Sequence, residues 1–255
     1  MLVPERVRSL LGPATRFTTV ESLPSVDSTN RLVAARAAAG EPEGLVVAAE
    51  LQTAGRGRLD RSWEAEVGAA LLVSVLLRPA DLPVSRWFLL SAAAGVAARQ
   101  ACHQVGGFTP DLKWPNDLLV GERKLAGILA ETTGRAAVVG MGLNVHAGPR
   151  GAAWADEAAG RRIDRSELLA AWLGRLDHHL GRWDDLLAAY RRACSTIGRE
   201  VTVEQGDGRL VGRAEAIDPD GRLVVRDASG ARVAVSSGDV IHLRTAVGKD
   251  GDPAR

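Results

Sequence analysis

Two apolar runs in the first third of the chain constrain its fold more than any other feature. Residues 44–51 and 69–77 carry mostly aliphatic side chains, and a proline at position 79 closes the second run. Apolar runs of this length are typical of strands that are buried within a sheet. Segments with helical spacing alternate with these runs, so we expect an α/β fold.

The spacing of apolar, glycine and proline residues predicts the other elements of the first part of the chain. An edge strand is expected over 17–23, and the strands flanking residues 120–124 should form a hairpin. Trp172 and Trp183 are expected in the core, and His178 and His179 in solvent or at a helix cap. Helices are expected over 27–40, 84–105, 165–182 and 184–194, and short strands over 112–114, 117–120, 125–131 and 136–143.

The pattern changes after Ile197 and Gly198. From there on, short alternating segments are separated by glycine or Asp-Pro-Asp-Gly turns, at 201–204, 210–217, 223–226 and 232–235. They predict a small all-β barrel, and the tail after Arg244 is expected to be disordered. We therefore expect one domain at 15–197 and a second at 198–245.

Composition limits the functions that the chain can have. Its 255 residues, 46% hydrophobic and 25% charged, suffice for one sizeable core and a small second domain. A formal net charge of +1 provides no strong attraction to nucleic acid or to an anionic membrane. Cys102 and Cys194 lie far apart, which predicts neither a disulfide framework nor a metal site. Because no signal-peptide pattern or apolar run of about 20 residues occurs, a cytoplasmic protein is expected.

A glycine- and arginine-rich segment directly follows the first buried strand. It spans residues 52–63 and contains Arg56, Arg58 and Arg61. Glycines let the backbone approach a ligand closely, and guanidinium groups bind phosphate or carboxylate oxygens. The segment is therefore a candidate anion site, although a solvated surface turn can have the same composition.

Lysine is rare in this chain. The 32 basic residues include only three lysines, Lys113, Lys124 and Lys249, and the first two share one short segment. A compact ammonium group can reach a single oxygen in a narrow pocket, which a guanidinium cannot do as well. Lys113 and Lys124 are therefore candidates for chemistry, with chance clustering of a rare residue as the alternative.

Five short motifs follow one another along the first domain. They are Ser28-Thr-Asn30, Gln52-Thr-Ala-Gly-Arg-Gly-Arg58 with Trp63, Lys113-Trp-Pro-Asn-Asp117, Lys124-Leu-Ala-Gly-Ile-Leu129 and Gly140-Met-Gly-Leu-Asn144. Together they resemble the motif set of the biotin protein ligases over residues 15–195, and the terminal barrel resembles that family's SH3-like C-terminal domain. The resemblance implies a mixed sheet flanked by helices, as in the catalytic domain of class II aminoacyl-tRNA synthetases.

The resemblance also implies a two-step reaction. The carboxylate of biotin attacks the α-phosphate of ATP to give biotinyl-5'-AMP and pyrophosphate, and a lysine of a biotin carboxyl carrier domain then takes the biotinyl group. The carrier domain would belong to an acyl-CoA or pyruvate carboxylase, and Mg²⁺ would accompany ATP. Because only a short segment precedes the motifs, a monofunctional ligase without DNA binding is expected.

Residue roles follow from the same resemblance. Lys124, Arg58 and Lys113 would act in catalysis by cancelling the repulsion between the two anionic substrates, with Lys124 central in both steps. Biotin would contact Ser28, Thr29, Asn30, Gln52, Gly55, Arg56, Gly57, Arg58, Lys124, Gly127 and Leu129. The nucleotide would contact Arg58, Arg61, Trp63, Lys113, Asn116 and Asn144.

Some of these roles have alternatives. Residues 28–30 can cap a helix, Trp114 can belong to the core, and Asp117 would orient its turn. The segment 52–63 is expected to cover the reactive adenylate, with Trp63 as one wall.

Two other functions are compatible with parts of the sequence. A lipoate or octanoate ligase or transferase of the same superfamily would also move an acyl chain, but the arginine-rich loop and the Lys-Trp-Pro-Asn-Asp segment favour biotin. A nucleic-acid-binding regulator would use the arginines and the small barrel. The near-neutral charge argues against it, and Arg6 and Arg8 are a weak substitute for a DNA-binding domain.

Overall fold

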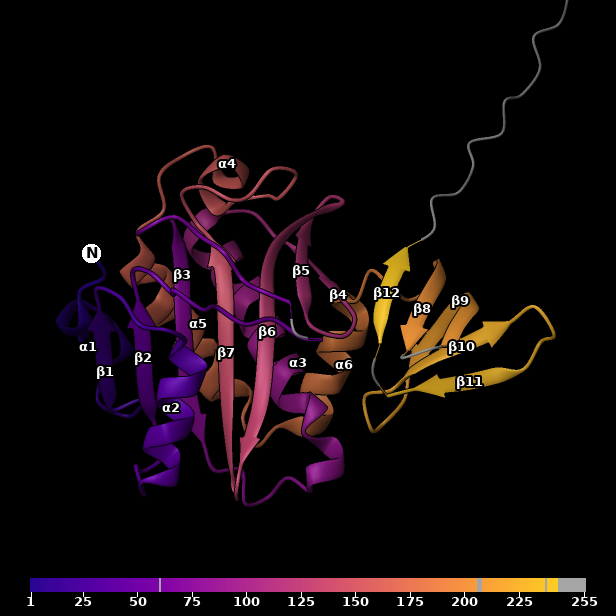
Figure 1. Ribbon diagram of the computed structural model, residues 1–255, viewed down its shortest axis with the longest axis horizontal. Coiled ribbons are helices and arrows are strands. Elements are labelled where there is room, and N and C mark those ends of the chain that lie inside the picture. Colours follow the sequence, from indigo (N-terminus) through magenta and orange to yellow (C-terminus); the bar gives the residue numbers. More distant parts are fainter. Residues whose placement is uncertain (60, 206–207, 237, 243–255) are drawn as a thin grey trace, which may run out of the picture. The chain divides into compact units, whose positions relative to one another are not determined.

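The computed structural model describes residues 1–59, 61–205, 208–236 and 238–242 (Figure 1). It divides into two compact units, Met1–Cys194 and a second unit that starts at Ser195. The expected domain boundary after residue 197 lies close to this division. The tail that was expected to be disordered lies outside the described residues. Along the described parts of the chain, no helix is long and apolar enough to cross a membrane.

A seven-stranded mixed sheet is the centre of the first unit (Figure 1). Its order is β1-β2-β3-β7-β6-β5-β4, in which only β1 and β2 are parallel neighbours. The two apolar runs became β2 and β3, and all of their residues are buried, as expected. The strands are β1 (Thr19–Leu23), β2 (Leu45–Ala49), β3 (Ala70–Leu77), β4 (Asp111–Lys113), β5 (Asp117–Val120), β6 (Arg123–Thr133) and β7 (Ala136–Asn144).

Helices cover both faces of this sheet (Figure 1). On one face, Val33 and Ala37 of α2 (Thr29–Ala38) pack against apolar residues of β2, β3 and β7. On the other lie α3 (Phe88–Ala101), α5 (Arg165–His179) and α6 (Trp183–Ala193). The helix expected over 84–105 is divided into a 3₁₀ turn, α3 and a π-helical turn at Cys102–Gly106. The predicted mixed sheet flanked by helices is confirmed.

Two expectations about α5 and α6 need correction. Trp172 is fully buried, as expected, but Trp183 is only half-buried, and its indole N–H donates to Asp81 Oδ2 at 2.8 Å. His179 is buried rather than solvated and lies 2.9 Å from Gln100 Oε1 through its Nε2. Burial, reinforced by neighbouring positive side chains, lowers the pKa of His179 to about 4.

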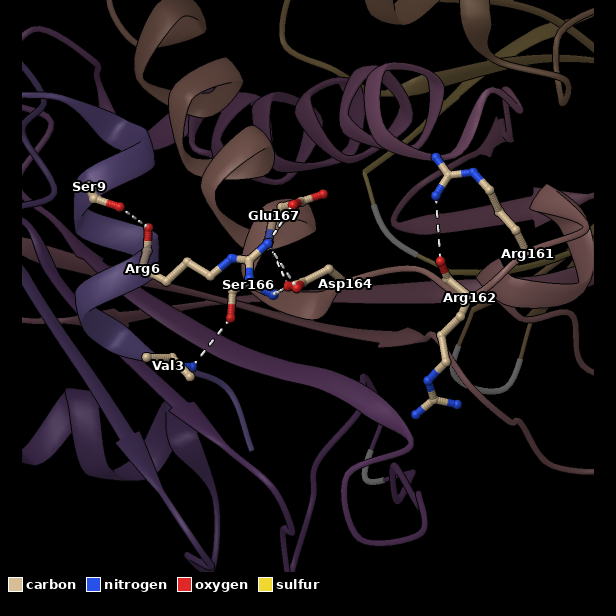
Figure 2. A network of polar contacts seen from close by, with 8 residues as sticks. All are labelled: Val3, Arg6, Ser9, Arg161, Arg162, Asp164, Ser166 and Glu167. Atoms are coloured by element: carbon tan, nitrogen blue, oxygen red, sulfur yellow. Dashed lines mark hydrogen bonds and ion pairs between the residues drawn. The ribbon is translucent and has the colours of Figure 1, made fainter.

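Two short helices were not expected, α1 (Pro4–Leu11) and α4 (Ala155–Ala159). Helix α1 packs against α5 through the fully buried Val7. Figure 2 shows the polar contacts beside it, where Arg6 pairs with Glu167 at 2.6 Å and with Asp164 at 3.2 Å. Arg8 pairs with an acidic residue of α1 itself. Both arginines of the leading segment therefore already have carboxylate partners.

The second unit contains one five-stranded antiparallel sheet, in the order β11-β10-β9-β8-β12. Four of its strands match the segments expected from the sequence, whereas β12 was not expected. Its inward-facing residues, such as Val201, Ala214 and Val225, are fully buried. The all-β prediction is confirmed, and the SH3-like form stays a prediction. The strands are β8 (Glu200–Gln205), β9 (Gly208–Ile217), β10 (Leu223–Asp227), β11 (Arg232–Val235) and β12 (Asp239–His242).

Candidate functional site

The candidate site occupies the face of the sheet that carries α2, starting at the N-terminal end of that helix. Lys113, Asp117, Gly127 and Gly142 are successive partners across β4, β5, β6 and β7. Directly paired residues project from the same face of a sheet. Strand register thus brings one lysine, one carboxylate and two glycines from four segments into one row.

A buried polar network lies beside this row. The backbone N–H and Oγ1 of Thr29 lie 2.7 Å and 3.0 Å from Gln52 Oε1, and Ser74 Oγ lies 2.7 Å from Thr29 Oγ1. Ser74 Oγ also donates to Asn30 Oδ1 at 2.6 Å. Gly140 makes room for this arrangement, because a Cβ there would lie 2.0 Å from Asn30 Oδ1. The predicted residues at 28–30 and 52 are therefore brought together.

Helix capping does not explain the polar residues at the start of α2. Ser28 occupies the N-cap position but makes no side-chain capping bond. The side chains of Thr29 and Asn30 bond to the network across the sheet instead, and all three residues are buried. The capping alternative is wrong for these side chains, which leaves their polar atoms facing the site.

The glycine- and arginine-rich loop folds back on itself and binds the sheet. Trp63 N donates to Gly55 O at 3.0 Å, and Gly57 N donates to the carbonyl of residue 61 at 2.6 Å. Arg56 Nη1 lies 2.9 Å from Glu131 Oε1, and Arg58 Nη1 donates to Asn116 Oδ1 at 3.2 Å. Both guanidinium groups thus have partners outside the loop, but Arg56 is still exposed, so the anion-binding role of the loop stays a prediction.

Not every arginine of the loop reaches the sheet in the same way. Arg61 is exposed, and its described backbone bonds close the turn with Gly57 and Arg58. Asn116, which accepts from Arg58, donates through Nδ2 to Ile128 O at 2.8 Å. Asn116 is thus fixed between the loop and β6, while a role for Arg61 toward a nucleotide stays a prediction.

Lys124 stands three residues before Gly127 on β6, and its side chain reaches the row. Its Nζ is 2.7 Å from Asp117 Oδ1 and 5.7 Å from the centroid of the Trp63 ring. The Trp63 ring rests on the glycines, since a Cβ on Gly142 would lie 2.4 Å from Trp63 Cε2 and one on Gly127 3.2 Å from Trp63 Cζ3. One ammonium group therefore faces a carboxylate and an aromatic ring that is packed on two glycines.

The remaining predicted residues flank this centre. Lys113 is half-buried, and no bond joins it to another described side chain. Asn144 is 1% exposed and donates from Nδ2 to Ala153 O at 3.1 Å. Its Oδ1 is buried and has no hydrogen-bond partner among the described residues. Trp114 is 1% exposed, which confirms that it belongs to the core.

Two polar members of the site lie outside the predicted set. Ser74 is the one polar side chain in an otherwise apolar strand, which was a usable signal. Glu131 lies two residues beyond Leu129 and so projects from the same face of β6, as strand periodicity would have indicated. Neither belongs to the five motifs.

The described residues include no group of three histidine, cysteine, aspartate or glutamate side chains placed to hold a metal ion. The two carboxylates of the site, Asp117 and Glu131, are each engaged by a cation. The site therefore combines neutral polar groups, two cation–carboxylate pairs and the further cations Lys113 and Arg58.

Two family models match the chain. Residues 22–147 match the Biotin/lipoate A/B protein ligase family, and residues 196–243 match the Biotin protein ligase C terminal domain. A Mycobacterium tuberculosis protein named Biotin--[acetyl-CoA-carboxylase] ligase is 39% identical, over 92% of this chain and 93% of that protein. The chain belongs to the biotin protein ligase family. This confirms the family that the five motifs resemble.

Further members and a solved structure agree with this assignment. The Bifunctional ligase/repressor BirA of Bacillus subtilis is 31% identical to this biotin protein ligase, over 75% of this chain and 64% of that protein. A structure of biotin protein ligase from Aquifex aeolicus in complex with biotin and ATP matches with a TM-score of 0.78 and 26% identity. That match covers 90% of this chain and 100% of the other.

Proposed function

We propose that this biotin protein ligase activates biotin with ATP as biotinyl-5'-AMP and transfers the biotinyl group to a lysine of a biotin carboxyl carrier domain. The observation that carries the proposal is the position of Lys124, whose Nζ lies 2.7 Å from Asp117 Oδ1 and faces the Trp63 ring beside Gly127. The acetyl-CoA-carboxylase ligase name of the Mycobacterium tuberculosis relative and the biotin and ATP of the Aquifex complex support it.

The polar network is suited to the ureido ring of biotin. Biotin combines an apolar bicycle with one urea group, so its pocket should be mostly apolar with a few polar anchors. Asn30, Thr29, Ser74 and Gln52 supply such anchors from elements that are buried and bonded to one another. We propose that residues 28–30, Gln52 and the loop backbone at 55–57 hold the ring, and that Gly127 and Leu129 line the acyl tail.

The cations of the site can offset the charge repulsion between the substrates in the first step. A carboxylate oxygen of biotin attacks the α-phosphorus of ATP, and the bond to the pyrophosphate oxygen breaks. Both partners are anions, so fixed positive charge must offset their repulsion. We propose that Lys124, Lys113 and Arg58 provide this charge, with Asp117 orienting the ammonium group of Lys124.

In the second step, the neutral amine of the carrier lysine attacks the acyl carbon of the mixed anhydride, AMP leaves, and the amine loses its proton to form the amide. Negative charge grows on the acyl oxygen, where Lys124 would stabilise it. Trp63 and the loop would keep water from the anhydride, because the Trp63 ring lies over Gly127 and Gly142.

Asn116, Asn144 and Arg61 are proposed nucleotide contacts. The buried Oδ1 of Asn144 supports this, since a ligand hydroxyl or amino group would satisfy it. Magnesium would arrive with the phosphates of ATP. Asp117 and Glu131 are each paired with a cation, so they do not form a cage for it.

The wider setting of the reaction is also proposed. Acceptors would be carrier domains of acyl-CoA or pyruvate carboxylases, and the reaction would take place in the cytoplasm, where ATP is available. Nucleic acid is not an expected partner, because the net charge is +1 and Arg6 and Arg8 are ion-paired.

A pyrophosphate-exchange assay tests the proposal. The protein is incubated with ATP, Mg²⁺ and one of three acids, biotin, lipoate or octanoate, and biotinyl-AMP and transfer to a carrier-domain lysine are sought by mass spectrometry. Biotin-dependent exchange and transfer are expected. Exchange that depends on lipoate or octanoate but not on biotin would reject the proposal in favour of the related acyl ligases.

A further inference from the structure

Glu131 uses its two carboxylate oxygens on two different parts of the site. Oε2 accepts a hydrogen bond of 2.9 Å from Asn30 Nδ2, and Oε1 lies 2.9 Å from Arg56 Nη1. Asn30 belongs to α2, and Arg56 belongs to the glycine- and arginine-rich loop. One side chain of β6 therefore joins the helix and the loop.

The contact with α2 is rigid. Asn30 is 4% exposed, its Oδ1 accepts from Ser74 Oγ at 2.6 Å, and its Nδ2 also donates to Leu129 O at 3.2 Å. Gly140 lies directly against Oδ1. The amide of Asn30 thus has a fixed orientation, and a carboxylate that accepts from it is fixed as well.

The contact with the loop rests on one ion pair. Arg56 is 43% exposed in its side chain and Glu131 28%. In the parts of the chain that the structure describes, Glu131 is the only carboxylate within ion-pair distance of Arg56. A second contact holds the loop further along, where Arg58 donates to Asn116.

We propose that Glu131 is a positioning residue that keeps the loop against β6, and that this contact depends on the orientation of Asn30. The assignment of the pocket to biotin rests on the proposed function, but the link between α2 and the loop does not. Glu131 lies seven residues beyond Lys124 on β6 and bonds to Asn30 and Arg56, so it acts through these two side chains. Its loss should release the loop and shorten the residence of biotinyl-AMP more than it slows adenylation.

Limited trypsin digestion of the ligand-free protein tests the link directly. Cleavage of the Arg58–Leu59 bond is followed by mass spectrometry in the wild type, Glu131→Gln, Arg56→Gln and the double variant. Each single change should accelerate cleavage about two- to fivefold, the range of a partly exposed ion pair. The double variant should be cleaved no faster than either single one, because both changes break the same pair.

Glu157→Gln is the matched control. Glu157 forms a similarly exposed ion pair with Arg123, at 3.0 Å, away from the loop. This variant should leave cleavage at Arg58 unchanged. If Glu131→Gln weakens the fold, as a urea titration would show, Arg56→Gln still tests the link from the loop side.

The dissociation rate of biotinyl-AMP gives a second readout. Glu131→Gln should raise this rate about two- to fivefold, a larger change than the one in maximal pyrophosphate exchange. If Glu131 had a purely structural role, Glu131→Gln would lower the global stability and would not affect the dissociation rate more than pyrophosphate exchange. Additive cleavage rates in the double variant, or unchanged cleavage in both single variants, would overturn the proposal. Absence of biotinyl-AMP in the wild type would instead reject the proposed function and leave the digestion result standing.

Discussion

Gly142 has no room for a side chain, because the Trp63 ring lies against it. A Cβ there would lie 2.4 Å from Cε2 of Trp63, closer than real carbon contacts allow. At neighbouring Gly140 the obstacle is polar, since a Cβ would lie 2.0 Å from Asn30 Oδ1. At the residue scale, the β7 glycines therefore shape both the aromatic wall and the polar pocket.

Gly142→Ala should displace Trp63 and shorten the residence of biotinyl-AMP. Overpacking of this kind costs about 1–3 kcal/mol, so we expect dissociation to be faster by roughly tenfold or more. Stopped-flow chase with excess biotin measures the rate. Gly174→Ala is the control, because nothing lies within 4 Å of its added carbon on α5. It should stabilise the fold by about 0.5–1 kcal/mol and leave the rate unchanged.

Lys124→Arg keeps the charge but replaces a compact ammonium group with a planar, longer one. Because Nζ lies 2.7 Å from Asp117 and beside Trp63, the larger group cannot occupy the same place. We expect adenylation to fall by about 10²–10³-fold with the fold retained. Pyrophosphate exchange and circular dichroism measure the two outcomes. The neighbouring substitution Arg123→Lys should leave adenylation nearly unchanged. Turnover in Lys124→Arg equal to that of the wild type would exclude a special role for the lysine.

At the element scale, a buried ion pair joins α5 to the residue that follows β2, and the N-terminal segment bonds to the same carboxylate. Glu50 Oε2 lies 2.7 Å from Arg165 Nη2, both side chains are 9% exposed, and Leu2 N donates to Glu50 Oε1 at 2.9 Å. Burial alone would raise the pKa of Glu50, but the Leu2 amide and Arg165 outweigh it and lower the pKa. Glu50 therefore connects α5, the residues before α1 and the strand that leads into the loop.

Arg165→Met should destabilise the protein by about 3–5 kcal/mol, because it leaves a carboxylate buried without its partner. Urea unfolding monitored by circular dichroism gives the free energy of unfolding. The comparison variant is Arg123→Met, which breaks the exposed pair with Glu157 and should cost less than about 1 kcal/mol. Similar losses in the two variants would show that burial does not govern the strength of the first pair.

His179 makes the packing of α5 on α3 dependent on pH. Its pKa is lowered to about 4 by burial, so between pH about 6.5 and about 4 the unfolded state binds more protons than the native state. Its contribution to stability is therefore complete above pH 6.5 and is lost as the pH falls toward 4.

The urea midpoint should accordingly fall less between pH 7 and pH 5 in His179→Gln than in the wild type. Glutamine can still donate to Gln100, but it does not titrate. His103→Gln changes an exposed histidine and should retain the wild-type pH slope. Parallel slopes in all three proteins would contradict the assigned cause.

At the scale of the whole molecule, ligand binding should be coupled to the stability of the first unit, because its site joins segments from residues 28 to 144. Biotin with ATP and Mg²⁺, at about 100 times the dissociation constant, should add about 2.7 kcal/mol. That corresponds to a rise in Tm of roughly 5–10 °C, measurable by differential scanning calorimetry. Lipoate with ATP should produce a much smaller rise, and the reverse order would favour the related acyl ligases.

The parts of the fold that the sequence predicted well are those that local patterns encode. Apolar runs mark β2 and β3, and glycine turns mark the β5–β6 hairpin, because burial and turn chemistry depend on neighbouring residues. Helix α1 was missed because it has only eight residues and is held by tertiary contacts of Val7. Trp183 and His179 were misplaced because helical spacing identifies a face but not the group packed against it.

In the candidate site, too, local patterns predicted some residues and tertiary contacts decided the others. Its glycines, arginines and lysines stand in short motifs, so their order along the chain identified the family. Ser74 and Glu131 stand outside the motifs, and their connections to Asn30 and Arg56 join residues far apart in sequence. No local pattern reports such pairings.

By itself, the sequence determined the α/β fold, the family and the segment that we propose binds anions, because burial periodicity and motif order are properties of short stretches of chain. Only the tertiary structure decided that Lys113, Asp117, Gly127 and Gly142 form one row and that Trp63 rests on it. The physical reason is strand register. A shift of one residue would turn these groups to the other face of the sheet, and the register is set by packing over the whole sheet.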